Sequence, residues 1–404
     1  MPETFSHTPV RKKPTIDFSI TGLVFCSMMM FMGLAAINSQ ANLLFGVFGL
    51  MIGVLLVSGI ISKAVLRRLA VRRILPESAT VGQPVVLTYE FLNLKRFWPS
   101  LSVGLAELDG VDAFTRQPSA YMLHAAPGMN AVVPIEVVPM RRGLHQLERY
   151  QISTSFPFGF IKRAVTGRQI DSFLVYPPLA HVDRHVLSLA RSAEKTGPSM
   201  RPRRGGDDEF YGLKEYRRGE STRNIYWRRS ARTGVIVSKE MTQVAPPRLL
   251  LLVDTYLNER TPTAHGNVER AIAMAASLAS SALESDILVG VYAYTTEGFH
   301  HLPANRGKRQ RRDILAFLAQ LPLNVEHPSD ELLAAAQPEF DPAITPILLT
   351  PQTGGTSTRP DQSRSGLVTL SATSDLTHAW FRFPGSIEFA TVMPPDQEPK
   401  IETS

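Results

Sequence analysis

Residues Leu249-Leu250-Leu251-Leu252-Val253, followed directly by Asp254, decide the fold class of the C-terminal part of this 404-residue chain. A short apolar run that ends at a carboxylate is typical of a strand buried on both faces of a parallel sheet. Between residues 268 and 283, apolar side chains recur three and four positions apart, which indicates an amphipathic helix. The pattern therefore predicts a buried strand followed by a helix that packs on its sheet.

The same alternation continues toward the C-terminus. Further apolar runs predict strands at 287–294, 347–349 and 367–370 and a helix at 314–321. Strands that alternate with helices imply βαβ units and a parallel, doubly wound sheet. We therefore predict an α/β domain at residues 246–392, with a loop at 352–366, which is rich in Gly, Ser and Thr, and a disordered tail at 393–404.

Residues 76–182 have a different pattern. Short β-rich runs occur at 85–91, 131–138 and 173–176, and Gly and Pro residues separate them. Several short strands between turn signals are typical of an antiparallel sandwich. We expect residues 76–182 to form a small antiparallel β-sandwich that serves as a spacer or an interaction module.

Residues 1–75 predict a membrane anchor. The chain carries no charge from Phe18 to Ser62, and this run would make about 68 Å of helix, too long for one span. A polar break at 38–42 divides it, so we expect a transmembrane helical hairpin with spans near 18–37 and 43–62. Gly49 and Gly53 are spaced so that they could bring the two helices close together. Cations at 11–13 and at 63, 67, 68, 72 and 73 flank the run, which by the positive-inside rule places both ends in the cytoplasm.

Composition excludes several classes of protein. One cysteine, Cys26, allows neither an intramolecular disulfide nor a zinc site built from several thiolates. The net charge of +7 is concentrated at residues 1–75 and 201–240. In the second of these regions six acidic residues are interleaved with eleven basic ones, so we expect no nucleic-acid binding. The chain contains no lysine-bearing phosphate loop, so we do not expect it to hydrolyse ATP.

The segment 183–245, between the two predicted domains, is the most distinctive. One part of it reads Glu209-Phe210-Tyr211-Gly212-Leu213-Lys214-Glu215-Tyr216-Arg217-Arg218-Gly219-Glu220. A second part reads Arg223-Asn224-Ile225-Tyr226-Trp227-Arg228-Arg229-Ser230-Ala231-Arg232-Thr233-Gly234. Charges of both signs are interleaved with aromatic residues, which favours a packed, salt-bridged surface over a flexible linker.

These two runs resemble the signature of the domain of unknown function 58 family. The family's first core has Gly-Asp where this chain has Gly219-Glu220, and its second core has Asp where this chain has Tyr226. Residues 155–160, Ser-Phe-Pro-Phe-Gly-Phe, also resemble the Phe-Pro-Phe-Gly turn that ends the β-domain of the family. The resemblance implies a hairpin anchor, a β-domain, the signature segment and a domain similar to von Willebrand factor A domains, in that order.

The resemblance also raises the question of a metal site. Domains of the von Willebrand factor A type often bind Mg²⁺ through Asp-x-Ser-x-Ser at a strand end, with a Thr and an Asp from later loops. Here Asp254 is kept, but Tyr256 and Asn258 replace the two serines, and Pro351 follows Thr350 where an acid is expected. We therefore expect a degenerate site at Asp254 and Asn258 without a cofactor, with bound Mg²⁺ as the alternative.

Two functions remain open at this point. The resemblance implies a non-enzymatic adaptor in the bacterial inner membrane, with most of the chain in the cytoplasm. Its partner would be a MoxR-type AAA+ ATPase, with a membrane transglutaminase-like protein and membrane lipid as further partners, and it would aid the assembly, remodelling or maturation of a protein complex. The alternative is an enzyme that uses charged residues of the 207–232 segment. We expect no catalytic residues, and the residues expected to fix the domain junction or contact a partner are Glu209, Phe210, Gly212, Leu213, Glu215, Tyr216, Gly219, Arg223, Trp227, Ser230, Ala231, Arg232 and Gly234.

Overall fold

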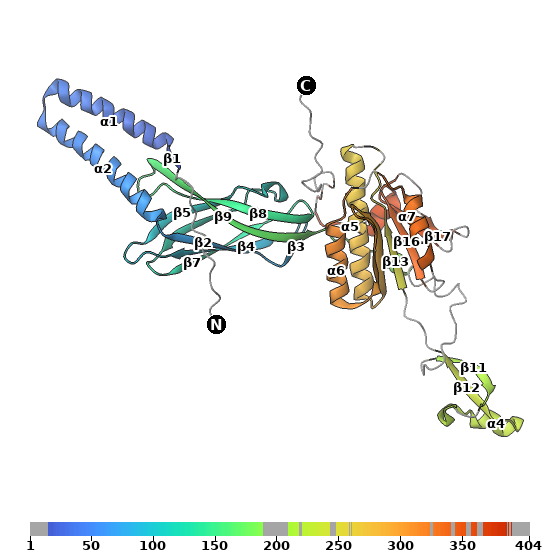
Figure 1. The fold of residues 1–404 in the computed structure, drawn as a ribbon. Coiled ribbons are helices and arrows are strands. Elements are labelled where there is room, and N and C mark those ends of the chain that lie inside the picture. Colours follow the sequence, from blue (N-terminus) through green and yellow to red (C-terminus); the bar gives the residue numbers. More distant parts are fainter. Residues whose placement is uncertain are drawn as a thin grey trace. The chain divides into compact units, whose positions relative to one another are not determined.

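The computed structural model describes residues 15–188, 209–217, 220–242, 248–257, 259, 261–323, 326–340, 344–352, 357–361, 367–385, 387 and 389. These residues divide into two compact units, one within Met1–Pro177 and the other within Pro178–Ala390. The first contains an apolar helical hairpin and a β-domain, and the second contains the signature segment and an α/β domain (Figure 1). The cations at 11–13 and the tail at 393–404 lie outside the described residues.

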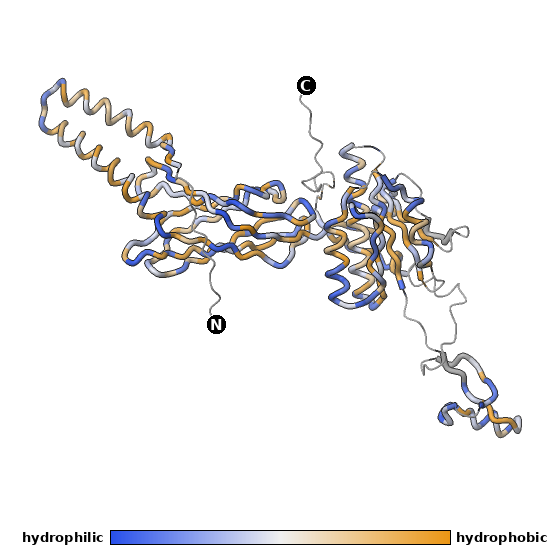
Figure 2. Tube along the Cα trace, viewed as in Figure 1, coloured by the Kyte–Doolittle hydropathy of each residue, from blue (hydrophilic) through white to orange (hydrophobic). Residues whose placement is uncertain are grey.

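Helices α1 (Ile20–Ser39) and α2 (Asn42–Leu66) form the predicted hairpin. The Ser19 hydroxyl caps α1 by accepting a hydrogen bond from the amide of Gly22 at 3.0 Å, and Gln40 adopts a left-handed conformation where the chain reverses. Of the helices in the described residues, these two are long and apolar enough to cross a membrane. Apolar residues dominate both helices along their length (Figure 2), and most of this apolar surface is not covered by the rest of the chain.

The two helices do not meet at Gly49 and Gly53. A Cβ added to either glycine would have no described atom within 4 Å, whereas a Cβ on Gly33 of α1 would lie 2.9 Å from the ring of Phe48. The small residue at the contact therefore belongs to α1, and an aromatic ring of α2 fills the space opposite it. The prediction that Gly49 and Gly53 bring the helices together is wrong, because that face of α2 points away from α1.

The β-domain contains two sheets within residues 15–177. Their strands are β1 (Thr15–Phe18), β2 (Leu69–Ile74), β3 (Ser78–Thr80), β4 (Val85–Asn93), β5 (Ser100–Glu107), β6 (Ser119–Ala125), β7 (Asn130–Val137), β8 (Gly143–Thr154) and β9 (Ile161–Tyr176). Among these described strands, one sheet has the order β1-β9-β8-β5-β6 with β3 also paired to β9, and the other has the order β2-β4-β7. All pairings are antiparallel except that of β3 with β9.

Buried residues alternate along the strands that face the core. In β4, Leu87, Tyr89 and Phe91 are fully buried, and the residues between them are partly exposed. This period of two matches the side-chain period of a strand with one face on a core. The architecture agrees with the predicted antiparallel sandwich, and its two sheets share one apolar interior.

A buried ion pair joins the two sheets. Arg73 of β2 donates from Nε to Oε1 of Glu107 at 2.9 Å and from Nη2 to Oε2 at 2.7 Å, so the pair is bidentate. Its Nη1 also bonds Oδ2 of Asp171 in β9 at 2.8 Å. Tyr89 of β4 donates its hydroxyl to Oε1 of Glu107 at 2.8 Å. A fully desolvated charge is tolerated only when its hydrogen bonds are satisfied in this way.

The hairpin is flanked by two strands that belong to the β-domain. Strand β1 pairs with β9 just before α1 begins, and β2 pairs with β4 just after α2 ends. The β-domain therefore starts before the predicted boundary at residue 76. Arg73, which the sequence places among the cations flanking the anchor, is instead a core residue with only 4% of its surface exposed.

The predicted runs correspond to β4, β7 and the end of β9, whereas β1, β2, β3, β5, β6, β8 and most of β9 were not predicted. In β8 the buried positions alternate with partly or fully exposed Leu, Gln, Glu, Arg and Ser side chains, so no apolar run marks the strand. The turn that contains Phe156, Pro157 and Phe158 connects β8 to β9. The expectation that this turn ends the β-domain is therefore wrong, since β9 continues from it to Tyr176.

The α/β domain is built around the apolar strand that contains Leu249–Val253. Its elements are β10 (His181–Val182), β13 (Arg248–Val253), α5 (Pro262–Glu284), β14 (Leu288–Thr295), β15 (Gly298–Asn305), α6 (Gly307–Ala319), α7 (Ser329–Ala336), β16 (Ile344–Thr350), β17 (Ser357–Asp361), β18 (Leu367–Ser371), α8 (Asp375–Trp380) and β19 (Phe381–Arg382). Among the described strands the main sheet has the order β15-β14-β13-β16-β18-β17. Helices α5 and α6 lie on one face of this sheet and α7 on the other (Figure 1).

The centre of this sheet is parallel, as the sequence predicts. Strand β13 pairs in parallel with both β14 and β16, and β16 pairs in parallel with β18. The edge strands β15 and β17 are antiparallel. Strand β17 lies inside the stretch at 352–366 that the sequence predicts to be a loop, so that expectation is wrong for residues 357–361.

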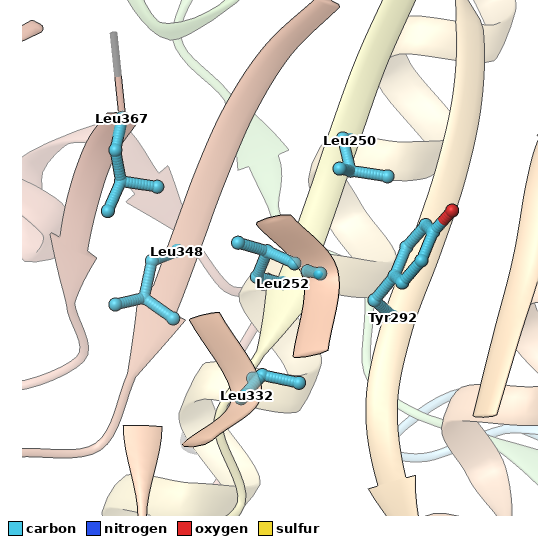
Figure 3. Close-up of a cluster of buried hydrophobic side chains, with 7 residues drawn as sticks. Leu250, Leu252, Tyr292, Leu332, Leu348 and Leu367 are labelled. Carbon is cyan, nitrogen blue, oxygen red and sulfur yellow. The ribbon is translucent and has the colours of Figure 1, made fainter. Parts of the chain in front are cut away.

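The strand Leu249–Val253 has a core on each side. Leu250 and Leu252 face α7 and pack in a cluster with Tyr292, Leu332 and Leu348 (Figure 3). The alternating residues Leu249, Leu251 and Val253 point to the opposite face, where α5 lies, and are also fully buried. Burial on both faces explains why the strand is a continuous apolar run.

Candidate functional site

The signature segment folds into a hairpin with a helical connection. Its elements are β11 (Glu209–Glu215), a 3₁₀ turn η2 (Thr222–Asn224), α4 (Trp227–Thr233) and β12 (Val237–Thr242). Strands β11 and β12 are antiparallel, with a register shift between Phe210 and Gly212. The interleaved charges of the sequence therefore belong to a short two-stranded sheet and not to an irregular linker.

Two of the predicted contact residues hold this hairpin together. The Ser230 hydroxyl donates to the carbonyl of Tyr226 at 3.0 Å and accepts from the amide of Val237 at 2.9 Å. Gly234 ends α4 in the left-handed conformation with φ +73°, and its amide donates to the carbonyl of Ser230 at 2.9 Å. Glycine is the residue that adopts this conformation at the least cost. Ser230 and Gly234 therefore define the local fold.

Both departures from the family pattern have a structural consequence. Glu220 keeps the charge of the family's Asp and pairs with Lys214 at 2.9 Å, and the hydrogen bond from this ammonium group lowers the pKa of Glu220. Tyr226 occupies the N-cap of α4, where its side chain caps no amide, and Lys239 lies 5.4 Å from its ring centroid. Asp is a favoured N-cap residue, whereas Tyr226 in this chain makes a cation–π contact and no side-chain cap.

An exposed surface runs over α4 and the turn after it. Trp227 is 65% exposed, and Val235 and Ile236 are nearly half exposed. The side chains of Arg223, Arg228, Arg229 and Arg232 are exposed around them. The described residues of its own hairpin therefore leave most of the Trp227 side chain uncovered. We call these seven residues the α4 surface.

The remaining predicted residues of the segment have the following places. Leu213 and Glu215 lie in β11, Tyr216 follows it with its hydroxyl donating to the carbonyl of Glu220 at 3.1 Å, and Ala231 is exposed in α4. Glu209 and Phe210 begin β11, but their side chains are not described, and Gly219 lies outside the described residues. Whether the segment fixes the domain junction stays a prediction.

The second candidate site lies at the carboxyl end of β13. Asp254 is buried there, with Oδ1 accepting from the amide of Tyr256 at 2.9 Å and Oδ2 accepting from the hydroxyl of Thr350 at 2.8 Å. The parallel pairing of β13 with β16 brings Asp254 and Thr350 together, as expected for residues that follow neighbouring parallel strands. The space beside Asp254 has no room for a water molecule. It is also lined by Val253, Thr255, Tyr294, His327 and Leu332.

These side chains do not fit a resident Mg²⁺. A magnesium ion requires near-octahedral oxygen ligands, whereas both carboxylate oxygens of Asp254 accept hydrogen bonds from the protein itself. Within the described ranges no group of three or more His, Cys, Asp and Glu side chains is placed to hold a metal ion. Asn258, the other residue of the predicted degenerate site, lies outside those ranges.

Asp254 should make folding stability fall as the pH rises. Burial raises the pKa of Asp254, and the nearby charge of Asp330 acts in the same direction, while the two hydrogen bonds oppose them. The folded state therefore holds a proton above the ordinary Asp pKa of about 3.9, where the unfolded state has released it. This contribution to the free energy of unfolding is present below pH ~4 and is lost as the pH rises through the raised pKa. The loss is about 1.4 kcal/mol for each unit by which the folded pKa of Asp254 exceeds the unfolded pKa.

The replacement Asp254→Asn removes this contribution. We expect wild type to lose unfolding free energy relative to Asp254→Asn between pH 4 and pH 8, measured by urea unfolding at a series of pH values. Other titrating groups cancel in the difference between the two proteins. A difference that stays constant, or that grows in favour of wild type with pH, would show that the buried carboxyl titrates normally.

Comparison with known families gives a match that covers most of the signature and extends beyond it. A family model described as protein of unknown function DUF58 matches residues 212–344, about a third of the chain. The match begins in β11 and ends at the first residue of β16, so it covers α4, the strand Leu249–Val253 and Asp254. The family suggested by the signature motif is thus confirmed over these residues. A comparison with curated proteins finds no match.

The sequence motif located the signature but did not distinguish the residues that stabilise its fold from those that remain exposed. Ser230 and Gly234 were grouped with Trp227 and Arg232 as contact residues, because one motif contains all four. The structure separates those that build the hairpin from those that remain exposed. Val235 and Ile236 were missed, although two consecutive β-branched apolar residues directly after a helix-ending glycine are a signal that could have drawn attention to them.

Proposed function

We propose that this protein is a membrane-anchored, non-enzymatic adaptor that binds a MoxR-type AAA+ ATPase through the α4 surface. The observation that carries the proposal is the exposure of Trp227, Val235 and Ile236, ringed by arginines, within the region that matches the DUF58 family. Tryptophan and arginine are the residues most often found at the energetic centre of interfaces. The excess of arginine would suit an acidic surface on the partner.

The remaining parts of the proposal rest on the helical hairpin of α1 and α2 and on the α/β domain. Helices α1 and α2 would anchor the chain in the bacterial inner membrane, with lipid around them and most of the chain in the cytoplasm. The parallel core of the α/β domain and the position of Asp254 at the end of β13 are consistent with a von Willebrand factor A-like fold, a fold that would serve binding rather than catalysis. A membrane transglutaminase-like protein is a further partner in this proposal, and nucleic acid is not.

The role of the adaptor would be to aid assembly, remodelling or maturation of a protein complex at the membrane. The enzyme alternative, with charged residues of 207–232 as catalysts, receives less support from the described carboxylates. Glu220 is engaged with Lys214 and with the Ser238 hydroxyl at 3.2 Å, and its pKa is lowered rather than raised. A general acid or base that works near neutral pH would need a pKa close to 7.

Co-purification of the ATPase with variants of the full chain tests the proposal. We expect Trp227→Ala and Arg232→Ala each to weaken binding by about 2 kcal/mol or more, roughly thirtyfold in Kd, since exposed anchors of this kind dominate interfaces. Arg309→Ala is the matched control, because Arg309 is an exposed arginine of α6 that pairs with Asp313 of the same helix at 3.8 Å. It should leave binding unchanged.

Limited proteolysis of the same variants reports on the domain junction. If both α4-surface variants resist protease like wild type and lose the ATPase, the surface acts as a partner contact. If both resist protease and still retain the ATPase, the adaptor role of this surface is wrong and the enzyme alternative gains weight.

A further inference from the structure

Three connections of the β-domain lie beside the open end of the helical hairpin. They are the β8–β9 turn at 155–160, the β4–β5 loop at 94–99 and the β6–β7 turn at 126–129. The β6–β7 turn joins the β4–β5 loop through two backbone hydrogen bonds, from the Asn93 amide to Met129 and from the Gly128 amide to Asn93. All three carry exposed apolar side chains, namely Leu94, Phe97, Trp98, Met129 and Phe158.

The β8–β9 turn is in close contact with the first turn of α1. The amide of Ser19 donates to the carbonyl of Phe160 at 3.1 Å, and the Ser19 hydroxyl donates to the carbonyl of Gly159. The rings of Phe160 and Phe25 stack with centroids 4.2 Å apart. A Cβ on Gly22 would lie 2.1 Å from the carbonyl oxygen of Phe160, so only glycine allows this approach.

The helix contact at Gly33 and Phe48 gives the level of this turn along the hairpin. Gly22 lies eleven residues before Gly33, and Gly59 lies eleven residues after Phe48. Because the two helices are antiparallel, Gly22 and Gly59 lie at the same level. Consistent with this, a Cβ on Gly59 would lie 3.7 Å from Cδ1 of Ile161, the residue that follows the turn.

The part of the hairpin beyond this level has the length of a bilayer core. From Gly59 back to the reversal at Gln40 there are nineteen residues, or about 29 Å of helix at ~1.5 Å per residue. The hydrocarbon core of a membrane is ~30 Å thick. When the hairpin spans a bilayer, the β8–β9 turn therefore lies at the boundary between hydrocarbon and headgroups.

The β4–β5 loop lies further out. Nζ of Lys95 donates to the carbonyls of Ala64 and Val65, at 3.1 and 2.6 Å, and the amide of Leu94 donates to the carbonyl of Arg68 at 3.0 Å. Ala64 and Val65 are five and six residues beyond Gly59, or about 8–9 Å along the helix. The loop therefore lies at the depth of the lipid headgroups.

The loop that presents the aromatic rings is well fixed. Nδ2 of the fully buried Asn93 donates to the carbonyls of Trp98 and Ala125, at 3.0 and 2.9 Å, and its Oδ1 accepts from the amide of Lys95. Even so, Phe97 is 76% exposed and Trp98 is 58% exposed. A rigid loop that holds two aromatic rings in solvent keeps apolar surface in water at a cost of about 25 cal/mol per Å².

The charges around these rings are cationic. Arg67 and Arg68 directly follow α2, Arg96 lies over the ring of Phe97 at 5.1 Å, and all three side chains are exposed. Trp is enriched at the membrane–water interface, and each Lys or Arg close to an anionic bilayer contributes about 1 kcal/mol of attraction. Aromatic rings and arginines at the headgroup level fit an anionic phospholipid surface.

We propose that this end of the β-domain is a lipid-contacting surface. This inference rests on the membrane anchoring proposed above. Phe158 enters the outer edge of the hydrocarbon, Phe97 and Trp98 lie among the headgroups, and Arg67, Arg68 and Arg96 bind anionic lipid phosphates. The surface fixes the β-domain against the bilayer, so the hairpin is not a free tether.

The test places one tryptophan at a time in the full chain. The chain has three, at 98, 227 and 380, so Trp227→Phe with Trp380→Phe leaves Trp98 alone. The protein is reconstituted into vesicles of phosphatidylcholine and phosphatidylglycerol, with or without bromine on the acyl chains as a quencher. We expect bromolipid to reduce the emission of Trp98, and vesicles to shield Trp98 from acrylamide.

Two further proteins give the depth and the control. Phe158→Trp, in a chain whose native tryptophans are all Phe, should be quenched more strongly than Trp98 by bromine placed deep in the acyl chain. A protein that retains only Trp227 should be quenched by acrylamide and not by bromolipid. Loss of phosphatidylglycerol from the vesicles should reduce the shielding of Trp98.

Flotation of the same vesicles separates the two proposals. Protein that fails to float with the vesicles contradicts the anchoring itself. If the protein floats, but acrylamide quenches both Trp98 and the Phe158→Trp variant while bromolipid quenches neither, the lipid-contacting surface alone is contradicted. Quenching of both in the expected order of depth supports it.

Discussion

Replacing Arg73 by methionine is expected to destabilise the β-domain by about 3–5 kcal/mol, because it leaves Glu107 buried without its cation. Glu107 is fully buried, and apart from Arg73 it accepts a hydrogen bond from the hydroxyl of Tyr89. Chemical unfolding of the full chain in detergent micelles, followed by hydrogen exchange of amides in β4 and β5, measures the loss. Arg168→Met is the control: Arg168 is exposed and pairs with Glu148 at 3.3 Å, so the loss should stay below about 1 kcal/mol.

The pH dependence of the variant gives a second readout. Burial raises the pKa of Glu107, and the hydrogen bond and charge of Arg73 oppose that rise. Without Arg73 the folded pKa rises further above the unfolded value, so the folded state keeps a proton that the unfolded state has lost. The defect of Arg73→Met should therefore be small near pH 4 and grow as the pH rises.

The double replacement Arg73→Met with Glu107→Gln should recover much of the stability, since it leaves no buried charge and Gln still accepts from Tyr89. If Arg73→Met behaves like the surface control, the buried pair does not hold the two sheets together.

Replacing Leu252 by alanine is expected to cost about 2–5 kcal/mol of stability in the α/β domain. Leu252 is fully buried and lies between Leu348 and Tyr292, with Leu332 of α7 below it (Figure 3). Removal of its side chain leaves a cavity lined by a sheet and a helix that collapse only partly. Leu376→Ala, the same substitution at a half-exposed position of α8, should change stability by no more than about 0.5 kcal/mol.

Thermal unfolding followed by near-ultraviolet circular dichroism measures both variants. A loss at Leu252 no greater than at Leu376 would mean that the cluster between the sheet and α7 is not closely packed. Because Asp254 follows Leu252 on the same strand, hydrogen exchange at the amide of Tyr256 also reports whether the strand end loosens with the core.

The elements that the sequence predicts well are those with a strong one-dimensional pattern. The run Leu249–Val253 is apolar because both of its faces are covered, and residues 20–66 form two long apolar helices of which the described residues cover only a small part. Either condition gives a continuous apolar run that can be recognised in the sequence without knowing which strands pair. Strand β8 is the opposite case, because its outer face is largely polar and one of its two partners, β5, lies well before it in the chain.

Arg73 shows why a charge pattern alone misleads. It follows an apolar run, as Arg67 and Arg68 do, and the positive-inside rule counts all three alike. What distinguishes Arg73 is the presence of Glu107 and Asp171 in strands β5 and β9, which no local pattern connects to it. The candidate site divides in the same way: the motif identifies Trp227 and Ser230 together, and only the hydrogen bonds of Ser230 and the exposure of Trp227 separate scaffold from surface.

The pairing of β1 with β9 has a consequence for the synthesis of the chain. Residues 15–18 pair with residues 161–164, and the whole hairpin lies between β1 and the rest of the β-domain. About 95 residues follow Leu66 before Ile161 is made, which takes about 5–20 s at ~5–20 residues per second. During that interval strand β9, which pairs with β1, has not yet been made. The growing chain therefore carries both apolar helices for several seconds before the β-domain can close.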